Sequence, residues 1–370
     1  MKDKINEHYF FIGTVAELIK VFPIMLDMEK RGIDYKIISS GQNKIEDSDI
    51  FKILKKDKID IYLSSKKIKK SAAGLLTWFI ETFFKSVFQF RKLFSKDKNV
   101  NRYMIIHGDT VSTLMGALLG KMFGFKVCHI EAGLRSFNLL QPFPEEIDRV
   151  LASKFVDIHF PPNEWAKSNL KKLKGDKVST TNNTLLDGLV YALNSKVSSN
   201  FLDQIKDDDF GVFVVHRQEN LINKTLLEEV VQAVKEVSQN KKVLFILHEI
   251  TKIAFQKYDL LKHIEDNKNI IIVDRLPYFE LMHILQKAKF IVTDGGSNQE
   301  ECYYLGLPTL ILRNYSERQE GLGENAMLYK GNYNLIRDFC LNYESYRRES
   351  LIGVDYKSPS SVVVDYLTSL

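Results

Sequence analysis

Carboxylates and arginines crowd into one stretch of this chain, HIEAGLRSFNLLQPFPEEIDR at residues 129–149. A carboxyl group whose pKa is raised by burial or by a like charge can act as an acid at neutral pH, whereas one paired with arginine stays ionised and can act as a base. Glu145 and Arg149 are four residues apart, so on a helix they lie on one face. Taken alone the pair is typical of a helix salt bridge, but beside Glu131 and the Asp109 of HGD it indicates acid–base chemistry.

The elements that must position these groups form two series along the chain. Short apolar runs such as YFFIG, YMIIHGD and VCHIEAG alternate with helical patterns, and a second series extends from FGVFVVHR to PTLILR. Such runs separated by helices are typical of parallel strands buried on both faces. Two series predict an α/β protein of two doubly wound, Rossmann-like domains, with residues 1–184 and the tail 356–370 in one and residues 185–355 in the other.

Polar or glycine residues end the apolar runs. They are Gly13, Gly41, His107–Asp109, Glu131, His216–Arg217, His248–Glu249 and Asp294–Gly296. Ligands of open parallel sheets bind at the carboxyl ends of the strands, so these residues predict an active site in the cleft between the domains. For His216, a hydrogen-bonded core histidine is the alternative interpretation.

The stretch TDGGSNQEECYYLG, residues 293–306, follows a predicted strand and opens a predicted helix. Its glycines let the backbone approach a ligand closely, and the N–H groups of a helix start suit phosphate oxygens. Glu300 or Glu301 would accept hydrogen bonds from ribose hydroxyls, or would simply stabilise the helix end. Downstream, Arg313 and Arg318 are candidate diphosphate contacts, with surface salt bridges as the alternative.

Composition narrows the class of protein. The 370 residues are 45% hydrophobic and 27% charged, which is ordinary for a globular enzyme, and the net charge of +5 suits solvated faces, with an anionic substrate or membrane surface as the alternative. No aromatic-basic module for nucleic acid is present, and no signal peptide is expected. Three cysteines far apart predict no metal site and no disulfide framework, hence a cytoplasmic protein.

An aromatic-rich helix is predicted at residues 71–94, SAAGLLTWFIETFFKSVFQFRKLF. Glu81 and Lys85 interrupt it, so it is no clean bilayer span. We expect a helix that faces the core of an α/β domain. Peripheral contact with a membrane, or with a partner subunit, is the alternative.

In combination, the motifs resemble those of the bacterial UDP-N-acetylglucosamine 2-epimerases of the non-hydrolysing type. The matching stretches cover most of the chain: residues 107–170 with HGDT, HIEAGLRS and PEEIDR, then NNTLLDGL, VVHRQEN, LPYFELMHIL and TDGGSNQEECYYLGLPTLILRNYSERQEG. The resemblance implies a two-domain fold like that of GT-B enzymes, a UDP-sugar substrate, no cofactor and a homodimer.

The resemblance also assigns roles by motif. Its catalytic residues fall on Asp109, Glu131, Glu145, Arg149 and His216. Its substrate- and UDP-binding positions fall on Thr14, Gln42, Arg135, Arg217, Leu276, Tyr278, Phe279, Gly295, Gly296, Ser297, Glu301, Arg313 and Arg318.

Three departures from the family pattern bear on the substrate. Val15 stands in GTVAE where the family has a UDP-binding arginine, and Asn43 stands in SGQN where it has a histidine. The family's DSGG is DGGS here. The catalytic set is intact, so these changes leave open which UDP-N-acetyl sugar is bound.

The reaction that the resemblance implies is inversion at carbon 2 of the sugar. The bond from carbon 1 to UDP breaks first, and a carboxylate removes the proton at carbon 2. Re-addition of UDP to carbon 1 of the glycal, with a proton delivered to the other face of carbon 2, then gives the epimer. The alternatives are a hydrolysing epimerase that releases free sugar and UDP, a GT-B glycosyltransferase, and a non-catalytic UDP-sugar sensor. Coupled carboxylates cannot be assigned as acid or base from spacing.

Overall fold

The computed structural model describes residues 5–56, 58–64, 72–94, 97–139, 143–197 and 209–370, so residue 71 of the aromatic-rich segment and residues 140–142 of the PEEIDR loop lie outside it. The chain divides into two compact units, residues 1–188 with 356–370 and residues 189–355. The boundary thus falls after Gly188 rather than after residue 184, within helix α6 (Leu185–Asn194). The predicted cleft between the domains stays a prediction.

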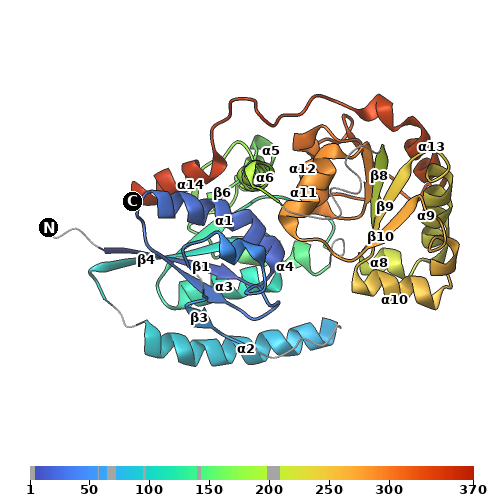
Figure 1. Cartoon of the computed structure of the whole chain (residues 1–370). Coiled ribbons are helices and arrows are strands. Elements are labelled where there is room, and N and C mark those ends of the chain that lie inside the picture. Colours follow the sequence, from blue (N-terminus) through green and yellow to red (C-terminus); the bar gives the residue numbers. More distant parts are fainter. Residues whose placement is uncertain (1–4, 57, 65–71, 95–96, 140–142, 198–208) are drawn as a thin grey trace. The chain divides into compact units, whose positions relative to one another are not determined.

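The first unit is built on a parallel sheet of seven strands in the order β3-β2-β1-β4-β5-β6-β7. Figure 1 labels β1, β3, β4 and β6 of this sheet. The strands are β1 (Ile5–Ile12), β2 (Tyr35–Ser39), β3 (Ile61–Tyr62), β4 (Val100–His107), β5 (Lys126–Ile130), β6 (Ile158–Phe160) and β7 (Asp176–Lys177). Besides α6, its helices are α1 (Val15–Lys30), α2 (Ala72–Leu93), α3 (Val111–Met122), α4 (Glu145–Ser153), α5 (Glu164–Asn169) and α14 (Pro359–Thr368). A short 3-10 helix spans Asp49–Lys52.

The second unit repeats this plan with a parallel sheet of six strands in the order β10-β9-β8-β11-β12-β13. The strands are β8 (Phe210–Val214), β9 (Lys242–Ile246), β10 (Ile270–Val273), β11 (Phe290–Thr293), β12 (Thr309–Ile311) and β13 (Ala326–Leu328). The helices are α8 (Gln218–Leu221), α9 (Lys224–Val237), α10 (Glu249–Lys257), α11 (Tyr278–Lys287), α12 (Gly296–Leu305) and α13 (Asn334–Asn342), with 3-10 helices at Leu261–His263 and Tyr343–Tyr346.

Both sheets are doubly wound, as the sequence predicts. The chain starts in the middle of each sheet, winds to one edge and then crosses back, so β1 and β4 are neighbours in one unit and β8 and β11 in the other. In open α/β sheets such a reversal leaves a crevice at the carboxyl ends of the two neighbouring strands. The two reversals therefore mark the places where each unit is expected to bind a ligand.

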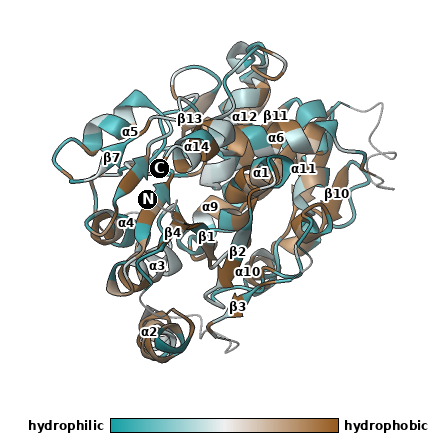
Figure 2. Ribbon diagram, turned by 90° about the vertical axis from the view of Figure 1, so that its left-hand side faces the viewer, coloured by the Kyte–Doolittle hydropathy of each residue, from teal (hydrophilic) through white to brown (hydrophobic). Residues whose placement is uncertain are grey.

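The apolar runs form strands because helices cover both faces of each sheet. All five residues of β8 are buried, as are the last five of β1, and Figure 2 shows β2, β3 and β10 in hydrophobic colours. An extended chain with apolar side chains on both faces is stable only in such a layer. Each unit has its own apolar cluster around its sheet.

The C-terminal tail belongs to the first unit. Asp187 of α6 accepts hydrogen bonds from the Tyr356 hydroxyl at 3.1 Å, the Ser358 hydroxyl at 2.9 Å and the Ser360 backbone N–H at 2.8 Å. Helix α14 then packs along α1, where Arg31 pairs with Asp365 at 2.5 Å. One half-buried carboxylate thus fixes the point at which the returning chain joins the first unit.

Helix α2 carries apolar residues on two faces. Trp78 and Phe90 lie in the core of the first unit, which bears out the expectation of a core-facing helix. On the outer face, exposed at every fourth position, are Leu76 (60%), Ile80 (46%), Phe84 (60%) and Phe88 (63%). Contact of this outer face with lipid or a partner subunit stays a prediction. Among the described helices, none has the length and apolar character that a membrane crossing needs.

Helix α2 offers a matched pair of substitutions. Phe90 is fully buried against Phe94, Phe123 and Phe125, so Phe90→Ala should lower the free energy of unfolding by about 3–5 kcal/mol because it removes a large core side chain and leaves a cavity. Phe88→Ala, two residues away on the exposed face, should change it by less than about 0.5 kcal/mol. Urea unfolding followed by circular dichroism measures both. Equal losses would show that the exposed face of α2 is buried in solution.

Candidate active site

The loops after β1 and β4 meet at the reversal of the first sheet. Glu17, in the first turn of α1, accepts hydrogen bonds from the backbone N–H groups of Gly13 at 2.6 Å and Thr14 at 2.7 Å, and from the Thr110 hydroxyl at 2.5 Å. The Thr14 hydroxyl in turn accepts from the Glu17 N–H at 3.2 Å and caps the helix. Thr14, predicted to bind substrate, therefore uses its side chain to fix this loop.

Gln42 lies at the same end of the sheet. Its side-chain oxygen accepts a hydrogen bond from the Ser112 hydroxyl at 2.6 Å, and Ser112 also contacts Ser40 at 2.7 Å. Glycine is required at position 13, because a Cβ there would lie 2.0 Å from the Ser112 oxygen. Hydrogen bonds thus connect the polar residues that follow β1, β2 and β4, and Gln42 is one of these residues.

Glu131 follows β5 and is buried with an unusual backbone. Its φ of 62° lies in the left-handed region, which non-glycine residues rarely adopt. Lys20 of α1 pairs with its Oε2 at 2.7 Å, the amide of Asn183 donates to the same oxygen, and the ring of His107 lies 3.9 Å away. The strain is tolerated because these groups hold the side chain in place, which is common at functional sites.

Arg149 joins carboxylates from two segments. Its guanidinium donates to Glu146 at 2.6 Å and to Asp109, which follows β4. Arg135 donates to the other oxygen of Glu146 at 2.5 Å. Burial opposes ionisation of Glu146, but the hydrogen bonds from Arg135 and Ser136 and the charge of Arg149 outweigh it and lower the pKa of Glu146.

Glu145 opens α4 beside this network. The charges of Glu145 and Asp109 both act on Asp148, one turn along the helix, so the three carboxyl groups are neighbours. Glu131 belongs to the same end of the sheet, since its Oε1 would lie 3.8 Å from a Cβ at Gly108, next to Asp109. The structure therefore brings together four of the predicted catalytic residues, Asp109, Glu131, Glu145 and Arg149.

His216 occupies the reversal of the second sheet. Its Nδ1 lies 3.0 Å from Oδ1 of Asp294, and its backbone N–H donates to the same carboxylate. Asp294 also accepts from the Arg217 backbone N–H at 2.8 Å and from the Asn220 amide at 3.0 Å. Burial raises the pKa of Asp294, but these hydrogen bonds more than offset it and lower the pKa, so the ionised carboxylate orients the His216 ring.

The ring of His248 stacks on that of His216 with a centroid distance of 4.9 Å. Burial, then the charges of His216 and Arg275, lower the pKa of His248 to about 4, so it is neutral at physiological pH. Arg217 caps α8 with its backbone, and its guanidinium contacts Glu219 at 3.4 Å. His216 is therefore an oriented histidine at a strand end, and its side chain is partly exposed.

The predicted phosphate site begins at α12. Gly295 is the residue before the helix and Gly296 its first residue, with Ser297 next. A Cβ at Gly296 would come within 3.1 Å of Glu317 and 3.5 Å of Arg313, so glycine keeps the helix start close to these charges. Glu301 is buried and accepts from Asn298 at 2.9 Å, which fixes it one turn into the helix.

The two arginines below α12 form buried ion pairs, so the interpretation as surface salt bridges is wrong. Arg313 donates to Glu317 at 2.8 Å, and Arg318 donates to Glu300. Burial raises the pKa of Glu317, but the charges of Arg313 and Arg318 outweigh this effect and hold the pKa far below its usual range. Each arginine thus has an internal carboxylate partner, which positions it near the helix start.

The predicted uracil segment starts α11. Tyr278 and Phe279 are the first two residues of that helix and Leu276 precedes its cap, all three half-buried. Phe279 packs against Tyr191 of the same unit with a centroid distance of 5.9 Å. The segment therefore offers aromatic faces of the kind that a base can stack on.

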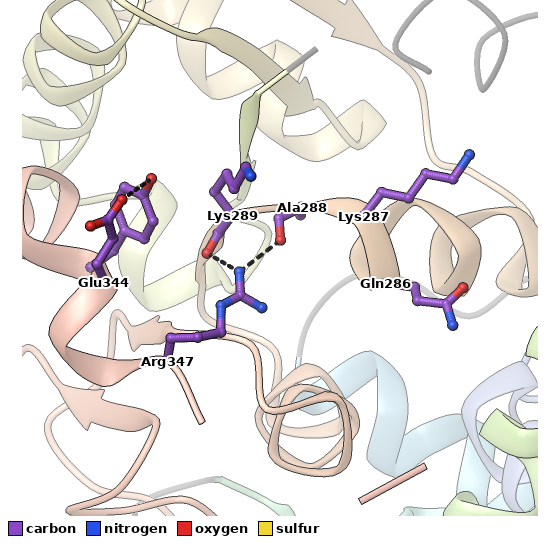
Figure 3. Close-up of a pocket in the computed structure, with 7 residues that line it drawn as sticks. Gln286, Lys287, Ala288, Lys289, Glu344 and Arg347 are labelled. Atoms are coloured by element: carbon purple, nitrogen blue, oxygen red, sulfur yellow. Dashed lines mark hydrogen bonds between the residues drawn. The ribbon is translucent and has the colours of Figure 1, made fainter. Parts of the chain in front are cut away.

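A surface pocket in the second unit lies away from these residues. It is lined by Gln286, Lys287, Ala288, Lys289, Tyr343, Glu344 and Arg347, and Arg347 donates to the carbonyl oxygens of Ala288 and Lys289 (Figure 3). Residue 289 precedes β11, so the pocket is at the amino ends of the strands. Ligands of such sheets bind at the opposite end, and we do not assign the pocket to the substrate.

Sequence reasoning missed several groups that hold the site. Lys20 and Asn183 bind Glu131, and Glu146 connects the two arginines of the first unit. For Lys20 a signal existed, since a lysine inside the apolar run LIKVF is costly to bury without a partner. Within the described ranges, no three or more His, Cys, Asp or Glu side chains are grouped so as to hold a metal ion.

Comparison with known proteins decides the family. A family model for UDP-N-acetylglucosamine 2-epimerase matches residues 27–336. This chain belongs to that family. It is 32% identical over 331 residues to the UDP-N-acetylglucosamine 2-epimerase of Methanocaldococcus jannaschii, covering 86% of this chain and 87% of that protein. It is 29% identical to the enzyme of Bacillus subtilis over 355 residues, with 93% and 90% of the two chains covered.

Solved structures of the family have the same fold. The crystal structure of the Methanocaldococcus jannaschii 2-epimerase in complex with UDP-GlcNAc and UDP matches with a TM-score of 0.81 and 27% identity, covering 99% of this chain and 100% of that one. The match to MurG of Acinetobacter baumannii, with a TM-score of 0.57 and 11% identity over 99% and 100% of the chains, shows the fold alone. The fold is therefore the GT-B-like α/β architecture that the motifs imply.

The pair of Lys20 and Glu131 generates a test of the buried charge. Both side chains are buried, so Lys20→Met leaves the carboxylate without its cation and should lower the free energy of unfolding by about 3–5 kcal/mol. Adding Glu131→Gln to Lys20→Met should recover most of that loss, because the uncompensated charge is gone. Denaturant unfolding of the two single variants and the double variant forms the cycle. Additive losses would show that the two groups do not interact.

Proposed function

We propose that this chain inverts carbon 2 of UDP-N-acetylglucosamine, or of a modified UDP-N-acetyl sugar, by elimination of UDP and its re-addition to a glycal. Membership of the 2-epimerase family supports the reaction class. The observation that carries the proposal is the set of Asp109, Glu131 and Glu145, held with Arg149 at the carboxyl ends of β4 and β5.

The first unit supplies the groups that the sugar chemistry needs. Breaking the bond from carbon 1 to UDP leaves positive charge on the sugar, which makes the proton at carbon 2 removable by a carboxylate. Inversion then requires a second proton donor on the opposite face. Glu131 is held by Lys20 and Asn183, whereas Asp109 is held by Arg149, so the carboxyl groups have different environments. Different environments separate proton affinities and allow one group to accept while another donates.

The second unit supplies groups suited to UDP. The backbone N–H groups at the start of α12 lie near Arg313 and Arg318, which favours a diphosphate there. We propose that Ser297 and Glu301 contact the nucleotide and that the segment Leu276–Phe279 binds the uracil. His216, oriented by Asp294, contacts the sugar or the diphosphate. Firm retention of UDP after elimination is what separates re-addition from release of free sugar.

Two substitutions affect substrate choice. Val15 and Asn43 stand where the family pattern has an arginine and a histidine, and the Asn43 backbone N–H donates to Gly13 at 2.8 Å. Losing a charge-assisted hydrogen bond to substrate costs about 1.5–3 kcal/mol. We propose that a modified UDP-N-acetyl sugar, with groups that meet Val15 and Asn43 differently, is a second candidate substrate.

We also propose that the protein works as a homodimer. The apolar outer face of α2 is a surface that a second copy could cover, and lipid contact is the alternative for the same face. The UDP-sugar is the small-molecule partner in either case.

The proposed reaction is tested in deuterated water. Incubation with UDP-N-acetylglucosamine should give a UDP-linked 2-epimer with deuterium at carbon 2, because the proton removed from that carbon is replaced from solvent. Nuclear magnetic resonance of the products measures both. Free N-acetyl sugar with UDP would identify the hydrolysing reaction, and unchanged substrate would direct the search to modified UDP-sugars.

Glu131→Gln tests the catalytic set. It should lower kcat by about 10²–10⁴-fold while the affinity for UDP stays unchanged, since the amide cannot exchange a proton. The matched control is Glu164→Gln, an exposed residue of α5 in the same unit, which should leave both unchanged. Full turnover by Glu131→Gln would remove Glu131 from the set and favour a non-catalytic role for this end of the sheet.

A further inference from the structure

Asp148 is a buried carboxyl group that the proposed reaction does not use. It lies on α4 with 6% of its surface exposed, and its Oδ2 has no hydrogen-bond partner among the described residues. Three carboxylates of this end of the sheet differ, because arginines bind Asp109 and Glu146 while Lys20 and Asn183 bind Glu131. A buried carboxyl group without such donors is costly in its charged form.

The charged neighbours of Asp148 make its ionisation harder still. Glu145 precedes it by three residues on the same face of α4, and Asp109 approaches from the loop after β4. Burial first, and then the charges of Glu145 and Asp109, raise the pKa of Asp148 to about 7. The pKa of this carboxyl group therefore lies close to neutral pH, where its protonated and ionised forms are both present.

In the part of the chain that the structure describes, no cation is found to offset these like charges. Helix α3 packs on α4, but its charged residue, Lys121, pairs with Asp157 at 2.5 Å at the far end of the helix. The guanidinium groups of Arg149 and Arg135 donate to Asp109 and to Glu146. Asp148 thus shares its surroundings with two predicted catalytic carboxylates, and it differs from Asp109, which Arg149 binds, in that its Oδ2 has no partner among the described residues.

We propose that Asp148 is a positioning residue for the epimerisation, holding a proton beside Glu145 and Asp109 and thereby setting how firmly those two groups hold theirs. The inference rests on the proposed function. In its neutral form Asp148 adds no negative charge, so ionised neighbours are stable. In its ionised form it strengthens proton binding by the same neighbours. The three groups titrate as a coupled set rather than singly.

The test is the pH profile of kcat for wild type and Asp148→Asn. Asparagine keeps the shape of the side chain but cannot ionise, so above neutral pH the neighbours lose a like charge. The limb of the profile that Glu145 and Asp109 govern should move to lower pH by about one unit, whichever of the two acts as acid. Glu164→Gln is the control, and its profile should match that of wild type.

A purely structural role for Asp148 would lower kcat or stability without moving the limb. Active wild type together with an unmoved limb in Asp148→Asn would therefore overturn the inference. If Asp148→Asn does not fold, infrared titration of the wild-type protein decides. A carboxyl group that gains its proton between about pH 6 and 8 supports the inference, and none in that range overturns it. Absence of turnover by wild type would instead overturn the proposed function.

Discussion

The stability of this end of the first unit depends on basic groups that compensate for the negative charge of its carboxylates. Asp109 and Glu131 lie just after β4 and β5, and Glu145 and Glu146 are the first residues of α4. An ionised carboxylate in such surroundings is stable only with donors at hydrogen-bond distance. Lys20 supplies them for Glu131, and Arg149 with Arg135 supplies them for Asp109 and Glu146.

These partners also place the carboxyl groups in different chemical environments. One carboxylate faces an ammonium and an amide, another faces a guanidinium, and Asp148 faces neither. The three carboxyl groups thus have three different sets of neighbours. An inversion at carbon requires this, because one group must take a proton while another gives one.

The second unit also gives its buried charged groups partners, but with a different result. Asp294 is fully buried and accepts hydrogen bonds from the backbone N–H groups of His216 and Arg217 and from Asn220, and the ring Nδ1 of His216 lies 3.0 Å from it. The buried pairs of Arg313 with Glu317 and Arg318 with Glu300 hold positive charge close to the start of α12. The result in this unit is fixed orientation, which suits retention of a nucleotide.

The sequence by itself determined the α/β class, the two doubly wound sheets and the strand ends that carry the functional groups, because apolar runs between helices have one stable arrangement and ligands bind at its carboxyl edge. Tertiary structure alone decided the partners. Lys20 and Glu131 are 111 residues apart in the chain, and Arg149 and Asp109 are 40 apart, so local spacing carries no trace of either pair. The spacing of Glu145 and Arg149 correctly predicted a helix that carries functional groups. The carboxylate that accepts hydrogen bonds from Arg149 and Arg135 is nevertheless Glu146, because the direction of a side chain depends on what packs around the helix. Burial without a cation, which sets Asp148 apart, is likewise a property of the folded chain.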